Sequence, residues 1–288
     1  MIRIREFQLS DVEFALTQTA REGWDCTAEL FHLCLAHEPK GCFIAEVDGR
    51  AAGMVTSTRY ARSAWIGNLI ITPDQRRCGL GQRLMEHVLT LLENAGVTTV
   101  HLEADPMGIG IYRRLGFKDR FESLRFRKTP PHKVSARADD SLVATKLTAP
   151  LAAHDLAEMQ RLDALSVADE RGRLLERYAS MAPAGYVVRN ERGLVGFALT
   201  WPSAFGVRFG PCVSADPAAA ESLLDAALAD FPDKTVILGV PAVNRAAIAL
   251  YEARGFARTP PCLRMTRGPL PDADKPEMIH AITNGCLG

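Results

Sequence analysis

A seven-residue segment occurs twice in this chain, about 140 residues apart, and this repeat constrains the fold most. Residues 111–117 have the sequence IYRRLGF, and residues 250–256 have the sequence LYEARGF. A second related pair precedes them, GNLIITP at 67–73 and GPCVSADP at 210–217. Self-similarity over such a distance indicates two duplicated domains and argues against a solenoid of short repeats. The length of 288 residues agrees, because a domain takes about 150 residues.

The hydrophobic pattern predicts the same order of elements in both halves. In the first half it predicts strands at 2–7, 41–47, 51–60, 65–71 and 97–103, helices at 11–20 and 27–36, a helix from the turn at Gly81 to Ala95, a short helix capped by Asp105-Pro106, and one or two strands within 117–126. In the second half it predicts helices at 153–165, 170–180, 217–231 and 244–254, a hairpin at 185–200, and strands at 207–214 and 235–240. This order is typical of an α/β domain on a mixed sheet.

We therefore expect a first domain at 1–130, a linker at 131–141 and a second domain at 142–288 that ends in a tail strand at 276–282. Apolar residues make up 47% of the chain, which excludes wholesale disorder. Lys+Arg and Asp+Glu both number 34, which argues against a nucleic-acid binder that relies on bulk positive charge. The charged N-terminus and the lack of a long apolar run predict a cytoplasmic protein with no membrane partner. The seven cysteines form no CxxC pair and the histidines no HExxH pair, so we expect no metal.

The segment 73–84, PDQRRCGLGQRL, lies between a predicted strand and an amphipathic helix. Gly79 and Gly81 let backbone N–H groups face a ligand, and the helix N-terminus adds unsatisfied donors. Arg76 and Arg77 add positive charge, and the combination suits a pyrophosphate. The spacing matches neither GxGxxG nor GxxxxGK[ST]. Taken alone, the segment also fits an ordinary turn with surface arginines.

Arg76-x-x-Gly79-x-Gly81 resembles the acyl-CoA pyrophosphate loop of the GNAT N-acetyltransferase superfamily, and Tyr112-x-x-Leu-Gly-Phe117 resembles that family's next motif. The resemblance implies two tandem GNAT-like domains, each a mixed, mostly antiparallel twisted sheet flanked by helices. It also implies acetyl-CoA as the co-substrate, with no metal. The backbone at Leu69, Ile70 and Ile71 would then pair with the pantetheine arm. The backbone of the following loop would hold the pyrophosphate, at Arg76, Arg77, Cys78, Gly79, Leu80, Gly81 and Gln82.

The same resemblance assigns Tyr112 as the general acid that protonates the departing CoA thiolate. Glu103 and Asp105 are candidates for the base, although either also fits a structural role, and Asp105 stands where the family often has Asn. Trp24 and Asp25 are expected in the acceptor pocket, as its wall and as an ammonium anchor. A packed Trp and a helix cap fit these two residues equally well.

The second half lacks the glycine loop, because Pro217 leads directly into a helix and Asp216 precedes it as a cap. We predict that this cap fills the anion site and that the second domain does not bind acetyl-CoA in the usual way. Tyr251 and Asn244 keep their motif positions and are expected to be structural. The chain thus resembles tandem GNAT proteins with a degenerate C-terminal domain.

These features predict an acyltransferase that moves an acetyl group from acetyl-CoA to a primary amine of a small molecule by direct attack. We expect no nucleic-acid partner and a monomer or homodimer. The alternative is a non-catalytic CoA-binding sensor or interaction module. A histone-type or tRNA-directed acetyltransferase would need a basic docking surface, and the zero net charge argues against one.

Overall fold

A computed structural model describes residues 1–132, 142–148, 151–270 and 274–288. Most of the predicted linker, 131–141, lies outside the described residues. The chain divides into two compact units that do not follow a single cut in the sequence. Unit 1 comprises 1–120 together with 264–270 and 285–288, and unit 2 comprises 121–263 together with 271–284. The far end of the chain therefore supplies two segments of unit 1.

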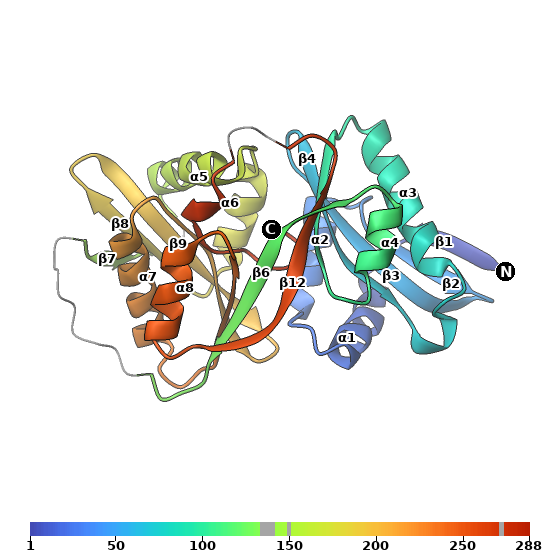
Figure 1. Ribbon diagram of the computed structural model, residues 1–288, viewed down its shortest axis with the longest axis horizontal. Helices are drawn as coiled ribbons and strands as arrows, with labels where there is room; N and C mark the ends of the chain where they lie inside the picture. Colours follow the sequence, from blue (N-terminus) through green and yellow to red (C-terminus); the bar gives the residue numbers. More distant parts are fainter. Residues whose placement is uncertain (133–141, 149–150, 271–273) are drawn as a thin grey trace. The chain divides into compact units, whose positions relative to one another are not determined.

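Unit 1 is built on a sheet with the strand order β1-β2-β3-β4-β5-β12 (Figure 1). The strands are β1 (Ile2–Glu6), β2 (Phe43–Val47), β3 (Arg50–Arg59), β4 (Ser63–Ile71), β5 (Thr99–Ala104) and the last four residues of β12 (Ala257–Arg267). Strands β1 to β4 pair antiparallel, and β4 pairs parallel with β5. The helices are α1 (Val12–Arg21), α2 (Ala28–His37), α3 (Leu80–Asn94) and α4 (Ile109–Arg114).

Unit 2 repeats this plan with the order β6-β11-β10-β9-β8-β7, and β13 also pairs with β10. Its strands are β6 (Lys118–Lys128, from residue 121), β7 (Ala144–Lys146), β8 (Gly185–Asn190), β9 (Gly193–Ser203), β10 (Gly206–Ser214), β11 (Val236–Pro241), β13 (Ile279–Ala281) and the part of β12 before residue 264. Its helices are α5 (Ala153–Val167), α6 (Gly172–Met181), α7 (Pro217–Asp230) and α8 (Arg245–Ala253). The predicted mixed, mostly antiparallel α/β fold is confirmed.

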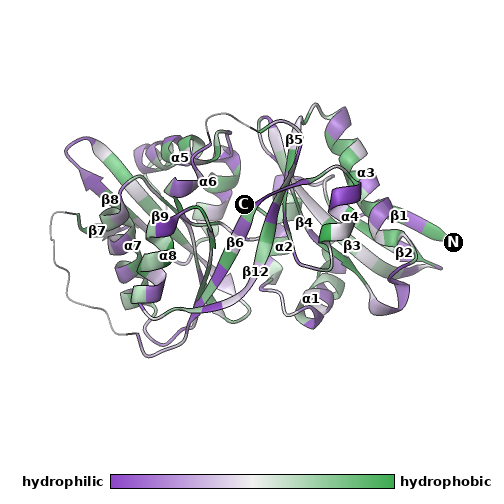
Figure 2. Cartoon of the chain, viewed as in Figure 1, coloured by the Kyte–Doolittle hydropathy of each residue, from purple (hydrophilic) through white to green (hydrophobic). Residues whose placement is uncertain are grey.

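The amphipathic pattern explains why α3 forms and where it packs. Leu84, Val88 and Leu92 recur at helical spacing and are buried, whereas Arg83 and Glu86 on the other side are exposed. Hydrophobic and hydrophilic residues alternate along the helices, and hydrophobic residues recur in the strands (Figure 2). No described helix is long and apolar enough to cross a membrane.

Three elements differ from the sequence prediction. Strand β12 was not predicted, because Pro260 and Pro261 interrupt its pattern. Residues 118–128 form one continuous strand. The predicted cap of the short helix is wrong: α4 starts at Ile109 with Gly108 as its N-cap, and the Asp105 carbonyl accepts a hydrogen bond from the Gly108 N–H at 2.8 Å. The intervening turn frees the Asp105 side chain for another partner.

Candidate active site

The glycine loop leads into α3 and leaves the start of that helix uncapped by a side chain. Gly79 is the N-cap residue and has a φ of +78°, a left-handed conformation that favours glycine. Because Gly79 has no side chain, the first N–H groups of α3 receive no cap from it. Arg77 also has a positive φ, +65°, which is strained for a residue with a side chain. The loop thus presents backbone donors at the positive end of a helix dipole.

The Arg76 side chain is bound within the protein and does not extend freely from the loop. Its guanidinium forms an ion pair with Glu22 and donates to the Ile71 carbonyl at 3.0 Å. The side chain is half-buried, whereas Arg77 is exposed. Arg76 therefore ties the loop to the end of β4, and Arg77 is the loop arginine placed toward solvent.

Strands β4 and β5 pair only over part of their length. The paired residues are 63–66 of β4 and 99–102 of β5, and β4 continues to Ile71. On its other side β4 is bulged, because Asn68 and Leu69 stand opposite the single residue Val55 of β3. Asn68 has a φ of +52°, and its amide donates to Thr56 Oγ1 at 3.0 Å. The predicted pantetheine-pairing residues, Leu69, Ile70 and Ile71, therefore lie on the stretch of β4 that extends past its pairing with β5.

Tyr112 lies on α4 and is 8% exposed. Its ring meets Phe117 edge-on, with the centroids 6.0 Å apart. Gly108 approaches the ring so closely that a Cβ there would lie 2.7 Å from Cε2, which explains a glycine at this turn. The tyrosine thus lies within α4, with its ring packed against the turn at Gly108.

Trp24 and Asp105 are brought together by the fold. The Trp24 indole N–H donates to Asp105 Oδ2 at 2.8 Å, which joins the α1–α2 turn to the end of β5. Trp24 and Asp25 are both half-buried in that turn. Asp105 thereby has a structural partner, while the pocket roles of Trp24 and Asp25 stay predictions.

Glu103 has a partner that sequence reasoning missed. Arg264, from the end of β12, donates from Nε to Glu103 Oε1 at 2.6 Å, and their side chains are only 7% and 2% exposed. The Arg264 guanidinium also lies over the Trp65 ring, 4.3 Å from its centroid. No spacing in the sequence signals a contact between residues 161 positions apart. The role of Glu103 as a base stays a prediction.

In unit 2 the equivalent helix, α7, is capped at its N-terminus by an Asp side chain. Asp216 is the N-cap of α7 and accepts from the Ala218 N–H at 2.9 Å. Pro217 at the first helical position further removes a donor. The predicted self-cap is confirmed, and a carboxylate occupies the position where an anion would bind.

The predicted tail strand, β13, pairs with β10 of unit 2. Strand β13 pairs antiparallel with Cys212 and Val213 of β10, and the Ile282 N–H donates to Gly239 of β11 at 2.9 Å. By the repeat, Cys212 and Val213 correspond to Leu69 and Ile70 of unit 1. The chain's own backbone therefore occupies in unit 2 the strand position predicted for the pantetheine arm in unit 1.

The motif residues of unit 2 hold this tail. The Tyr251 hydroxyl donates to the His280 carbonyl at 2.6 Å, and burial raises the pKa of Tyr251 well above its usual value. The Asn244 amide donates to the Ile279 carbonyl at 3.1 Å, and its oxygen caps α8 at Ala247. The structural roles predicted for Tyr251 and Asn244 are confirmed.

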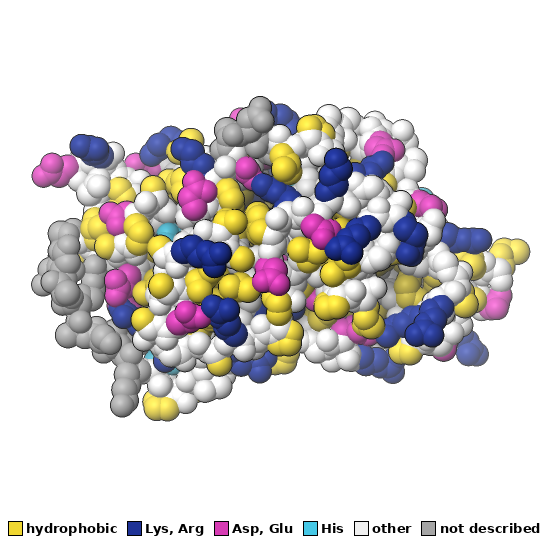
Figure 3. All heavy atoms as spheres, in the orientation of Figure 1, with side chains coloured by type: hydrophobic (Ala, Val, Ile, Leu, Met, Phe, Trp, Pro, Cys, Tyr) yellow, Lys and Arg dark blue, Asp and Glu magenta, His cyan; other side chains and the backbone are white. Residues whose placement is uncertain are grey.

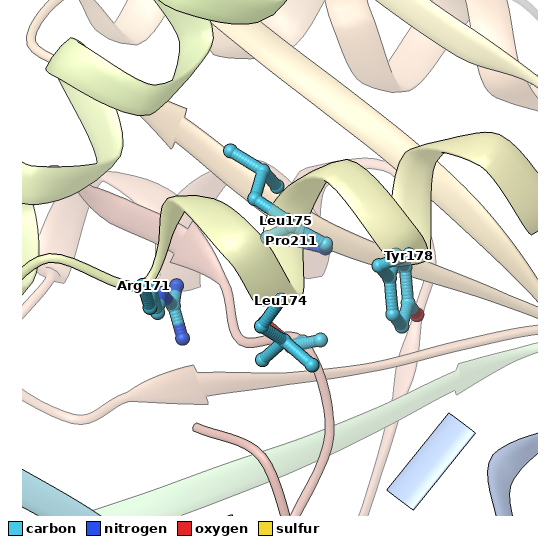
Figure 4. A pocket seen from close by; sticks show the side chains of 6 residues that line it. Arg171, Leu174, Leu175, Tyr178 and Pro211 are labelled. Atoms are coloured by element: carbon cyan, nitrogen blue, oxygen red, sulfur yellow. The ribbon is translucent and has the colours of Figure 1, made fainter. Parts of the chain in front are cut away.

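A small cavity in unit 2 lies beneath α6 (Figure 4). It has an empty volume of about 180 Å³, below the roughly 300–1,000 Å³ of ligand pockets. Arg171, Leu174, Leu175, Tyr178, Pro211 and Thr283 line it, and Arg171 is bound to Asp163. Its volume lies below the range of ligand pockets, so it is not a candidate for the acceptor site. Among the described residues, no cluster of His, Cys, Asp and Glu has the makings of a metal site.

Both halves of the chain match models of one family. Residues 7–117 match the acetyltransferase (GNAT) family, and residues 159–279 match an acetyltransferase (GNAT) domain. The two matches together span most of the chain, so the protein belongs to the GNAT acetyltransferases and carries two such domains in tandem.

Individual relatives agree with this assignment. The holothin acyltransferase of a Pseudoalteromonas species is 24% identical over 288 residues, which cover 99% of this chain and 92% of that protein. A structure from Pyrococcus horikoshii, provisionally named an acetyltransferase, aligns over 100% of this chain and 96% of its own with a TM-score of 0.83 and 22% identity. A tandem GNAT protein from the clavulanic acid biosynthesis pathway aligns over 94% and 100%, with a TM-score of 0.65 and 16% identity. The structural likenesses show the fold, and the family makes the chain an acyltransferase.

Proposed function

We propose that the chain is an acetyl-CoA-dependent N-acetyltransferase that acetylates a primary amine of a small molecule at unit 1 alone. The observation that carries this proposal is a contrast within the molecule. In unit 1, α3 begins at a glycine cap and β4 extends past its pairing with β5. In unit 2, Asp216 caps α7 and β13 pairs along β10.

The proposed reaction is direct attack of the neutral amine on the thioester carbonyl. The amine nitrogen forms a bond to the carbonyl carbon, and collapse of the tetrahedral intermediate breaks the carbon–sulfur bond. Tyr112 gives its hydroxyl proton to the departing thiolate, while Glu103 takes the proton from the amine nitrogen. The backbone at Leu69, Ile70 and Ile71 holds the pantetheine arm, and the first turn of α3 holds the pyrophosphate.

Two features support a small-molecule acceptor. The holothin acyltransferase, which is similar over nearly its whole length, is named for an acyl transfer that involves holothin. Positive and negative side chains also alternate over the displayed face without a large basic area (Figure 3). A nucleic-acid or membrane partner would favour a concentrated basic surface. Trp24 and Asp25 are proposed to line the acceptor side, in a monomeric or homodimeric cytoplasmic enzyme.

The test is a calorimetric titration with acetyl-CoA that compares Gly79→Asp with Gly79→Asn. Asn and Asp share one shape and both tolerate the left-handed conformation of Gly79, so the pair differs in charge alone. Gly79→Asp should copy the Asp216 cap. Two unit charges about 5 Å apart at an effective dielectric of 20 repel by about 3 kcal/mol, so the affinity should fall by about 10²-fold below that of Gly79→Asn.

The wild type should bind one acetyl-CoA per chain and acetylate at least one member of a panel of primary amines. Two sites per chain would show that unit 2 is also open. Equal affinities of the two Gly79 variants would contradict the anion site at α3. Binding without turnover of any amine would favour the alternative of a CoA-binding sensor.

A further inference from the structure

The ion pair between Glu103 and Arg264 uses only one oxygen of the carboxylate. Both Nε and Nη2 of Arg264 lie 2.6 Å from Oε1. Glu103 Oε2 is buried and has no hydrogen-bond partner among the described residues. A buried carboxylate oxygen without a partner is costly, so one that persists points to a ligand group that completes it.

A second buried pair in the same chain shows what a purely structural pair looks like. Arg171 donates from Nε to one oxygen of Asp163 at 2.7 Å and from Nη2 to the other at 2.8 Å. That pair is as buried as the first, with side chains 5% and 2% exposed, and both of its oxygens are used. The contrast lies in geometry, because both pairs join the same charged groups in a buried setting.

The Arg264 guanidinium is fixed on several sides. It lies over Trp65, whose indole N–H donates to the Gly285 carbonyl at 3.0 Å. His101, two residues before Glu103 on the same strand, has its ring 5.5 Å from that of Trp65 and shares a 2.8 Å hydrogen bond with Thr266. Burial, together with Arg264 and Arg120, lowers the pKa of His101 to about 3, so this imidazole is neutral in any ordinary assay.

We propose that Arg264 is the positioning residue for Glu103: it holds Oε1 and thereby leaves Oε2 for the acceptor amine. The inference rests on the proposed function, because it needs a proton acceptor at Glu103. Arg264 belongs to the last strand of the second repeat, yet it acts within unit 1. The degenerate repeat would then contribute a side chain that the chemistry depends on.

The test measures kcat and KM for Arg264→Met, Arg264→Lys, Glu103→Gln and the double variant, with tyramine, benzylamine and spermidine as acceptor probes. Arg264→Met should lower kcat by about 10²-fold, because a misplaced group of this kind costs that much. KM for acetyl-CoA and the binding stoichiometry should stay unchanged.

Arg264→Lys keeps the charge and should recover part of the rate, which a loss of folding alone would not allow. The double variant should be no slower than Glu103→Gln, because the two residues act as one unit. Arg171→Met is the matched control: it breaks the two-oxygen pair of unit 2 and should lower the melting temperature without changing kcat. Rates are divided by the number of acetyl-CoA sites found by calorimetry, so unfolded protein does not count.

An Arg264→Met enzyme with the wild-type kcat would overturn the inference while the proposed function stands. An additive loss in the double variant would do the same. A wild type that acetylates none of the three amines would instead overturn the proposed function, and the inference with it.

Discussion

Tyr112 and Tyr251 occupy the same position in the two repeats, and we predict that removal of their hydroxyls has opposite consequences. Tyr251→Phe should lower stability and leave the catalytic rate of folded protein unchanged. Tyr112→Phe should lower the rate, because a general acid contributes roughly 10²–10⁴-fold. Phenylalanine keeps the ring in both cases, so only the hydroxyl is tested.

The loss of stability expected for Tyr251→Phe follows from the surroundings of this side chain. The residue is 0% exposed, and its hydroxyl donates to the His280 carbonyl at 2.6 Å. Without that donor a buried carbonyl of β13 loses a partner, at a cost of about 1–3 kcal/mol. The ring contacts with Phe126 and Phe256, each with centroids 5.5 Å apart, are retained. For a unit of this size the melting temperature should fall by roughly 2–12 °C.

The assay pairs thermal unfolding with initial rates of acetyl-CoA consumption for both variants. The prediction is wrong if Tyr251→Phe lowers the rate of folded protein or if Tyr112→Phe leaves it unchanged. A large rate loss in Tyr251→Phe at full folding would mean that unit 2 takes part in the chemistry. Unchanged rates in Tyr112→Phe would remove the general acid from the mechanism.

Three further predictions concern the same contrasts. Asp216→Ala should lower the free energy of unfolding by about 0.5–2 kcal/mol, because α7 loses its cap. Calorimetry should still find one acetyl-CoA per chain, because β13 stays in place. A second site would mean that the cap alone prevents binding at unit 2. The pKa of His101 is about 3 in the folded chain, against an ordinary value of 6.5. Between these two pH values the unfolded chain binds a proton at this residue and the folded chain does not. The free energy of unfolding should therefore be constant above pH 6.5 and fall as the pH drops toward 3, by up to about 1.4 kcal/mol per pH unit. Urea unfolding of His101→Asn should show a flatter profile over that range, and an unchanged slope would contradict the burial argument. A fragment of residues 1–130 lacks the 264–270 and 285–288 segments of unit 1. It should aggregate in size-exclusion chromatography, because these segments no longer cover the edge of β5 and Trp65. A folded, monomeric fragment would show that the segments are dispensable.

The parts of the fold predicted correctly are those with local signals. The amphipathic face of α3 and the Asp216-Pro217 cap each follow from neighbouring residues, whereas α3 begins at Leu80, before the predicted turn ends at Gly81. The partners of Arg76 and Glu103 could not be predicted in the same way. Glu22 lies 54 residues from Arg76 and Arg264 lies 161 from Glu103, and one sequence carries no record of such pairings. The Asp105 cap failed for a related reason, because its preference for Trp24 over α4 is a tertiary effect.

The second repeat lacks the glycine loop but keeps the fold, and the composition of the units suggests why. Residues 264–270 count with unit 1, where Thr99 donates to the Pro269 carbonyl at 2.6 Å and Arg267 pairs with Glu93. Residues 285–288 also count with unit 1, where Tyr60 donates to the Leu287 carbonyl. A repeat without the glycine loop must still fold, because its last strand and its tail complete unit 1, the unit for which we propose the chemistry. Its own cleft is then closed by β13, so that the buried edges of β10 and β11 find backbone partners without a ligand.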